Sequence, residues 1–151
     1  MRSVILSVLI VFACSPVIAG EVVYSEQEQA IIDQLVGAWV ENKDKSLEQI
    51  YRKLEEEELD RETNRRLHFA RRLTEESDIV MTFSADGRVT LEGSMGNEEI
   101  DQTSKLRVLE VEDDKARVNF EGIEGERVLS LENGGFTLCC DIGITRYYIR
   151  H

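Results

Sequence analysis

Three side chains suited to binding an anion occur at alternate positions close to the end of the chain. They are Arg146, Tyr148 and Arg150, within the strand-like segment 145–150. Alternate residues of a β-strand point to the same face of a sheet, so in one of its two orientations this strand directs all three inward. A buried arginine requires an anion or several hydrogen-bond acceptors around it. A ligand carboxylate bound by Arg146 and the Tyr148 hydroxyl would satisfy that requirement.

The residues alone leave two alternatives to a bound carboxylate open. An acidic side chain inside the protein, such as Glu41 or Glu110, would neutralise Arg146 equally well. In the opposite orientation of the strand, Tyr147 and Ile149 line the core and the polar side chains face solvent. The sequence does not decide between the two orientations.

The lone tryptophan, Trp39, lies where the first strand is expected to begin. A capping box predicts a short helix over residues 25–36, and Gly37 is expected to end it. If the first strand pairs antiparallel with the last, Trp39 lies near Arg150, and a guanidinium over an indole ring is a favourable contact of about 0.5–2 kcal/mol. We therefore expect Gly37, Trp39 and Arg150 to close one end of a β-barrel.

A charged helical insert is predicted between the first two strands, over about residues 45–76. The sequence Ser46-Leu47-Glu48-Gln49 has the form of a capping box and is expected to open its first helix. A second helical stretch follows a break near Asp60. The acidic run 55–58 and the arginine pairs further along are typical of a solvated face, and they also offer a surface for a protein partner.

From Ile79 onward the apolar residues follow the period of two that is typical of β-strands. Strands are predicted over residues 79–84, 89–91, 106–111, 116–120, 127–131, 136–140 and 145–150, whereas the polar stretch 94–103 is expected to be a loop. With the first strand this gives eight strands joined mostly by short turns. Such a meander tends to close into an up-and-down antiparallel barrel, which is either filled or holds one small ligand.

The first nineteen residues resemble an export signal, with a charged Arg2, an apolar run and a small-residue cleavage site at Ala19. We therefore expect a signal peptide over 1–19, one barrel domain over 20–151, and a periplasmic or extracellular protein. Alternatively, Val11-Phe12-Ala13-Cys14 loosely resembles a lipobox, which would anchor the protein through a lipid on Cys14. No other segment is expected to cross a membrane.

Charge and residue spacing argue against several classes of function. With 18 basic and 30 acidic residues, the net charge is −12, which disfavours nucleic acid as a partner. His68 and His151 occur in neither catalytic nor metal-binding spacing, and no phosphate-binding glycine loop is present. Cys139 and Cys140 are expected to point to opposite faces of a strand without forming a disulfide. We therefore expect no enzyme, metal or cofactor.

Together these features resemble the calycin superfamily, and the small exported bacterial lipocalin-like proteins most of all. Gly37-x-Trp39 is similar to the first-strand motif of that superfamily, and the helical insert resembles the lid of fatty-acid-binding proteins. Arg146-x-Tyr148 resembles the terminal Arg-x-Tyr with which many of those proteins bind a fatty-acid carboxylate. The lipocalin disulfides and second motif are absent, and the insert is longer and more charged than the lid.

The resemblance implies a lipocalin-like barrel in which Arg146 and Tyr148 bind the ligand. The expected function is that of an exported binding protein for a small apolar or amphipathic ligand that bears a carboxylate. The alternative is a filled barrel that acts through its surface, as a protein-interaction module or an inhibitor in the cell envelope. The large inward side chains predicted for the strands favour a small cavity or none.

Overall fold

The computed structural model describes residues 23–56, 58–140 and 143–151, so the predicted signal peptide and Cys14 lie outside the described residues. Three helices and eight strands follow one another along these ranges. They are α1 (Glu26–Leu35), β1 (Gly37–Glu41), α2 (Lys43–Leu54), α3 (Arg61–Glu76), β2 (Ser77–Phe83), β3 (Arg88–Met95), β4 (Glu98–Glu112), β5 (Lys115–Phe120), β6 (Arg127–Glu132), β7 (Gly135–Cys139) and β8 (Thr145–Arg150).

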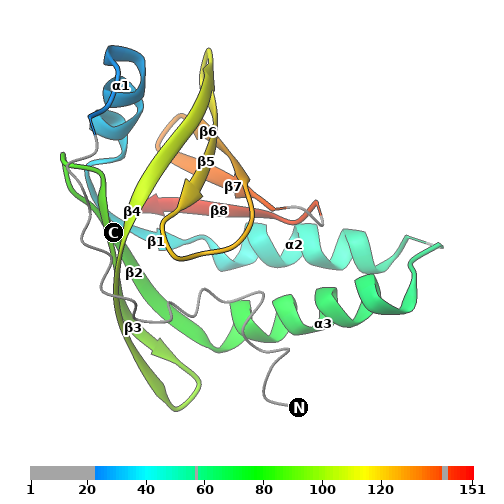
Figure 1. Ribbon diagram of the computed structural model, residues 1–151. Helices are drawn as coiled ribbons and strands as arrows, with labels where there is room; N and C mark the ends of the chain where they lie inside the picture. The colour runs from blue at the N-terminus through cyan, green and yellow to red at the C-terminus, as the bar shows by residue number, and fades with distance from the viewer. Residues whose placement is uncertain (1–22, 57, 141–142) are drawn as a thin grey trace.

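The eight strands form one closed antiparallel barrel in chain order, as the sequence predicts (Figure 1). Each strand pairs with the next, and β1 pairs with β8 to complete the wall. The register places Trp39 opposite Arg150 and Glu41 opposite Tyr148. Strands β1 and β8 are therefore neighbours in the wall, and side chains of the first and last strands lie next to one another on its inner face.

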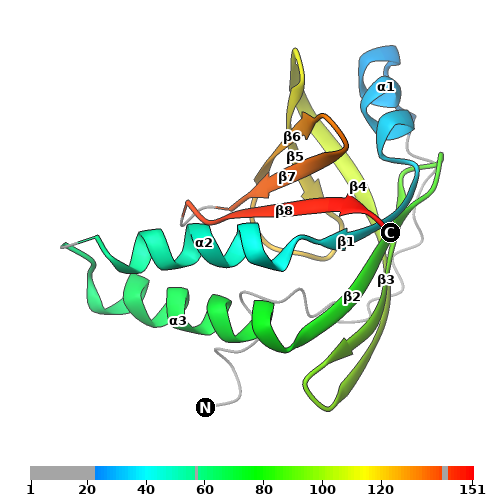
Figure 2. The ribbon, with the colours of Figure 1, turned by 180° about the vertical axis from the view of Figure 1, so that it is seen from behind.

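Helix α1 lies at one end of the barrel (Figures 1 and 2). Its capping box at Ser25 is present as predicted, and Ile31, Ile32 and Leu35 are buried in the same apolar cluster as Trp39. The indole Nε1 of Trp39 donates to the Leu35 carbonyl at 2.6 Å. This end of the barrel is therefore filled by apolar side chains.

Helices α2 and α3 form the predicted insert, but α2 begins at Lys43 and not at the predicted capping box. Asn42 is the N-cap, and its side chain accepts from the backbone N–H of Lys45. Ser46 lies fully buried inside the helix, where its hydroxyl accepts from the backbone N–H of Tyr147 at 3.1 Å. The serine of the predicted capping box therefore connects α2 to β8 through a hydrogen bond.

Helix α3 runs back alongside α2 and continues directly into β2 (Figure 2). Asp60 is its N-cap and accepts from the backbone N–H groups of Glu62 and Thr63, which agrees with the predicted break at this residue. Between the two helices, Ile50 and Leu67 form a second buried cluster together with Ile144.

The prediction of a loop over residues 94–103 is wrong. Strand β3 extends to Met95 and β4 begins at Glu98, so the two strands form a long hairpin with a turn at residues 96 and 97. Most side chains of this hairpin are exposed or half-exposed. Because residues 94–103 at the outer end of the hairpin include no buried side chain, they need not alternate between apolar and polar types, although the backbones of the two strands are paired up to the turn.

Candidate functional site

The last strand adopts the orientation in which its alternate polar side chains face inward. Tyr148 stacks on the core residue Phe136 with ring centroids 4.8 Å apart, and Arg146 reaches the inward-facing Glu41. Tyr147 lies on the other face, where the ammonium of Lys45 on α2 is 5.5 Å from its ring. The structure thereby settles the orientation that the sequence leaves open.

Arg150 lies at the α1 end of the barrel and does not contribute to the site. Its guanidinium is 3.8 Å from the centroid of the Trp39 ring, which is the predicted cation–π contact. It also donates to the carbonyls of Val36 at 2.6 Å and Gln34 at 3.2 Å, just where α1 ends. Arg150 therefore connects the last strand to the helix that covers the barrel.

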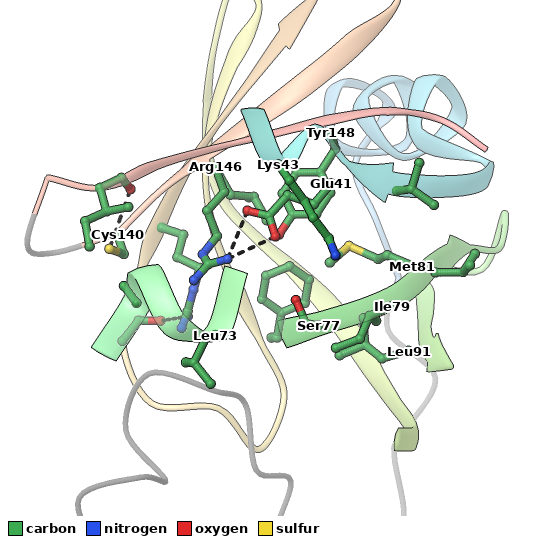
Figure 3. Close-up of a pocket in the computed structure, with 18 of the residues that line it drawn as sticks. Glu41, Lys43, Leu73, Ser77, Ile79, Met81, Leu91, Cys140, Arg146 and Tyr148 are labelled. Carbon is green, nitrogen blue, oxygen red and sulfur yellow. Dashed lines mark hydrogen bonds and ion pairs between the residues drawn. The ribbon is translucent and has the colours of Figure 1, made fainter. Parts of the chain in front are cut away.

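A cavity of about 430 Å³ lies towards the other end of the barrel, against helix α3 (Figure 3). Much of its wall is apolar, with contributions from the four strands β2, β3, β5 and β7, from α3 and from the segment before β8. These apolar side chains are Ala70, Leu73, Ile79, Met81, Leu91, Phe120, Leu138 and Ile144. Glu41, Arg146 and Tyr148 are the polar residues that β1 and β8 add to the same wall.

Arg146 forms an ion pair with Glu41 inside the wall. Its Nη1 is 2.9 Å from Oε1 and 3.1 Å from Oε2 of Glu41, and it also donates to the Thr74 hydroxyl at 3.2 Å. The Arg146 and Glu41 side chains are only 22% and 12% exposed. Of the two acids considered from the sequence, Glu41 neutralises Arg146, whereas Glu110 pairs with Arg117 on the surface.

The protonation states of this wall follow from burial and from the ion pair. Burial lowers the pKa of Arg146, but Glu41 and Tyr148 together raise that pKa above its ordinary value, so the guanidinium stays charged. Burial also raises the pKa of Tyr148, and so does Glu41, while Arg146 lowers it; the net change is upward. The Tyr148 hydroxyl is thus a protonated hydrogen-bond donor, and it makes no hydrogen bond to a described residue.

The wall of the barrel opens between β1 and β2, at the end of the barrel where β1 is followed by α2 and β2 is preceded by α3. Strands β1 and β2 pair only as far as Val40 and Val80, and past this pair Lys43 Nζ lies 3.3 Å from Asp78 Oδ1. The Lys43 side chain is 35% exposed and that of Asp78 is 88% exposed. We call this gap, spanned by the Lys43–Asp78 ion pair, the seam.

The cavity reaches the seam. It is lined by the inward side chains of Glu41 and Met81, by the outward side chain of Val80, and by both members of the ion pair. Figure 3 shows the Lys43 side chain extending past Glu41 towards Ser77 and Met81. The sequence does not reveal this pair, because the two residues are 35 positions apart and meet only where the strands separate.

In the part of the chain that the structure describes, the remaining cysteine and histidine side chains do not form a second site. Cys139 and Cys140, the two cysteines among the described residues, are free, and the Cys140 thiol lines the cavity and donates to the Ile144 carbonyl at 3.6 Å. His68 is exposed on α3. Within the described ranges, no group of histidine, cysteine and acidic side chains is arranged to hold a metal ion. No helix in those ranges has the length and hydropathy to span a bilayer.

Comparisons of the chain with protein-family models, with curated proteins and with solved structures found no match. The eight-stranded closed barrel is compatible with a lipocalin-like fold. Because one fold supports many functions, the case for a function must come from the cavity and its residues.

Proposed function

We propose that this protein binds one small amphipathic molecule inside a lipocalin-like barrel. The cavity carries the proposal, because its volume of about 430 Å³ lies within the range of about 300–1,000 Å³ that is typical of small-molecule sites. Its apolar wall provides surface for the apolar part of the ligand. Burial of that part supplies most of the binding free energy, at roughly 25 cal/mol per Å² of apolar surface.

Polar groups at the end of the cavity orient the ligand. The Tyr148 hydroxyl is free to donate to an oxygen of the ligand, and Arg146 has further N–H groups besides the Nη1 that Glu41 and Thr74 occupy. We infer that the ligand group nearest these residues is an uncharged oxygen, such as a carbonyl or hydroxyl. A carboxylate here, as the Arg-x-Tyr resemblance implies, would lie next to the carboxylate of Glu41.

The proposal is for binding rather than catalysis, and for a protein exported by the signal predicted over residues 1–19. The alternative of a filled barrel that acts through its surface remains as the competing proposal. It predicts that no small molecule accompanies the protein, and the presence of the cavity argues against it.

Native mass spectrometry of the purified protein tests the proposal. We expect a bound mass of a few hundred daltons with the wild type, and its loss in Ile79→Trp, which places a larger side chain in the cavity wall. Val128→Trp is the control, because Val128 is 40% exposed on β6 and does not line the cavity. A bare polypeptide in every sample, with no uptake of an added amphiphile, would contradict the proposal and favour the filled-barrel alternative.

A further inference from the structure

We propose, building on the proposed function, that the ligand is an anionic amphiphile whose charged head group binds Lys43 at the seam. The head group displaces Asp78 from Lys43, and the apolar part of the molecule extends from the seam into the cavity. Asp78 thus occupies the site of the ligand's anion when no ligand is bound.

The first argument is that Arg146, the arginine that β8 places in the inner wall of the cavity, is already neutralised. Both carboxylate oxygens of Glu41 lie close to Arg146 Nη1, and the Thr74 hydroxyl contacts the same nitrogen. A second anion at this position would be held beside Glu41 in a largely water-free wall, where like charges repel strongly. Arg146 and Glu41 together make the inner end of the cavity electrically neutral.

The second argument is that the Lys43–Asp78 pair is easily exchanged. Because the Asp78 side chain is 88% exposed, this carboxylate is well hydrated whether or not it contacts Lys43. Ion pairs of this exposed kind contribute little to stability, so replacing Asp78 by a ligand anion costs little. Displacing Glu41 from Arg146 would instead leave the Glu41 carboxylate unpaired in a largely buried part of the wall.

The third argument is geometric continuity. One cavity is lined both by Lys43 at the seam and by Ile79, Met81 and Leu91 on the inner face of the wall (Figure 3). A single molecule can therefore contact the ammonium of Lys43 with its head group and these apolar side chains with the rest. Its charge stays near solvent, which avoids the cost of burying an ion.

Two fluorescent probes that share one ring system test this inference. They are 1-anilinonaphthalene-8-sulfonate, which is anionic, and N-phenyl-1-naphthylamine, which lacks the sulfonate. Binding of each probe is measured by fluorescence titration with the wild type and with Lys43→Met. We expect Lys43→Met to weaken binding of the sulfonate about tenfold and to change binding of the neutral probe less than about twofold.

Two further variants sharpen the test. Lys45→Met removes a positive charge from the same turn of α2, but on the side that faces Tyr147, so we expect it to leave both affinities unchanged. Asp78→Asn removes the competing carboxylate, so we expect it to strengthen binding of the sulfonate about twofold to fivefold. Urea unfolding of each variant checks that the fold is intact.

The outcomes separate this inference from the proposed function. If both probes bind and Ile79→Trp abolishes binding, but Lys43→Met affects the two probes equally or not at all, the cavity binds ligands and the assignment of Lys43 is wrong. The same holds if Lys45→Met weakens the sulfonate as much as Lys43→Met does. If neither probe binds the wild type, both the assignment and the binding function are overturned.

Discussion

The guanidinium of Arg150 occupies the space in which a Cβ on residue 37 would lie. Gly37 adopts a φ of +126°, a region that favours glycine, and its missing side chain lets Arg150 approach both Trp39 and the last carbonyls of α1. The Gly-x-Trp sequence and the terminal arginine are therefore parts of one packing arrangement. That arrangement joins α1, β1 and β8.

Replacing Gly37 by alanine should destabilise the protein by about 2–4 kcal/mol. About 1–3 kcal/mol of this comes from the strained φ, and the remainder from displacing Arg150. The free energy of unfolding in urea measures the effect. Gly134→Ala is the matched control, because Gly134 also has a positive φ of +80° but has no neighbouring atom within 4 Å of the new Cβ. Equal losses in the two variants would show that the contact with Arg150 adds nothing.

Replacing Glu41 by glutamine should cost about 2–3 kcal/mol of stability. The reason is that Arg146 keeps its charge in a largely buried wall, although slight exposure puts the cost below the 3–5 kcal/mol of a fully buried pair. Glu110→Gln breaks the exposed pair with Arg117 and should cost less than about 1 kcal/mol. Urea unfolding of both variants checks this, and a loss for Glu41→Gln no larger than for Glu110→Gln would contradict it.

Removing both Glu41 and Arg146 tests whether the cost of Glu41→Gln comes from the charge that it leaves unpaired on Arg146. In the double variant Glu41→Gln/Arg146→Met no unpaired charge remains, so its loss of stability should be clearly smaller than the sum of the two single losses. Additive losses would mean that the two side chains do not interact.

Stability at alkaline pH should depend on Tyr148. Its pKa in the folded state is raised above the ordinary value of 10.0, so as the pH rises the unfolded chain loses the phenol proton first. The stabilisation is complete below pH 10 and is lost progressively above it. Tyr148→Phe should therefore lose less stability than the wild type between pH 8 and about pH 11, as measured by the urea midpoint at each pH.

The comparison of Tyr148→Phe with the wild type has to allow for a second tyrosine and needs a control variant. The pKa of Tyr24 is also raised, chiefly by burial, so part of the alkaline loss should persist in Tyr148→Phe. Tyr147→Phe removes a phenol from the opposite face of the same strand and serves as the control. The prediction fails if Tyr148→Phe and the wild type lose the same stability over this pH range.

Replacing Ser46 by alanine should destabilise the junction of α2 and β8 by about 1–3 kcal/mol. Ser46 is fully buried, and its loss leaves the backbone N–H of Tyr147 without its hydrogen-bond acceptor. Ser130→Ala, at a half-buried serine on β6, should change the free energy of unfolding by less than about 0.5 kcal/mol. Thermal or urea unfolding of both variants compares them, and a Ser46→Ala variant as stable as the wild type would rule out this role for the hydroxyl.

Most of the barrel could be predicted from the sequence because its strands alternate between apolar and polar residues. Met81 and Phe83, for example, lie two positions apart and both face the core. The outer part of the hairpin of β3 and β4, over residues 94–103, lacks this signal, since none of its side chains is buried and its pairing depends on backbone hydrogen bonds that any residue type can make. The polar segment 94–103 was therefore predicted as a loop.

The site was predictable in part. The spacing of Arg146 and Tyr148 placed them on one face, and Glu41 was one of two candidate partners, but the choice between them required the register of β1 against β8. Ser46 suggested a helix start because its context matches a capping box, whereas its hydroxyl is used by a strand distant in sequence. The seam depends on where two strands diverge, which no local pattern encodes.

Closure of the barrel by β1 and β8 has a consequence for synthesis of the chain. Every other neighbouring pair consists of strands that are consecutive in the chain, with α2 and α3 between β1 and β2, so the pairs from β1–β2 to β6–β7 can form before the last strand is available. Strand β1 has to wait for residues 145–150, and until then the nascent chain exposes the open edges of β1 and β7. Unpaired edges readily add strands from other chains, so the interval before β8 emerges is the period of greatest vulnerability to aggregation.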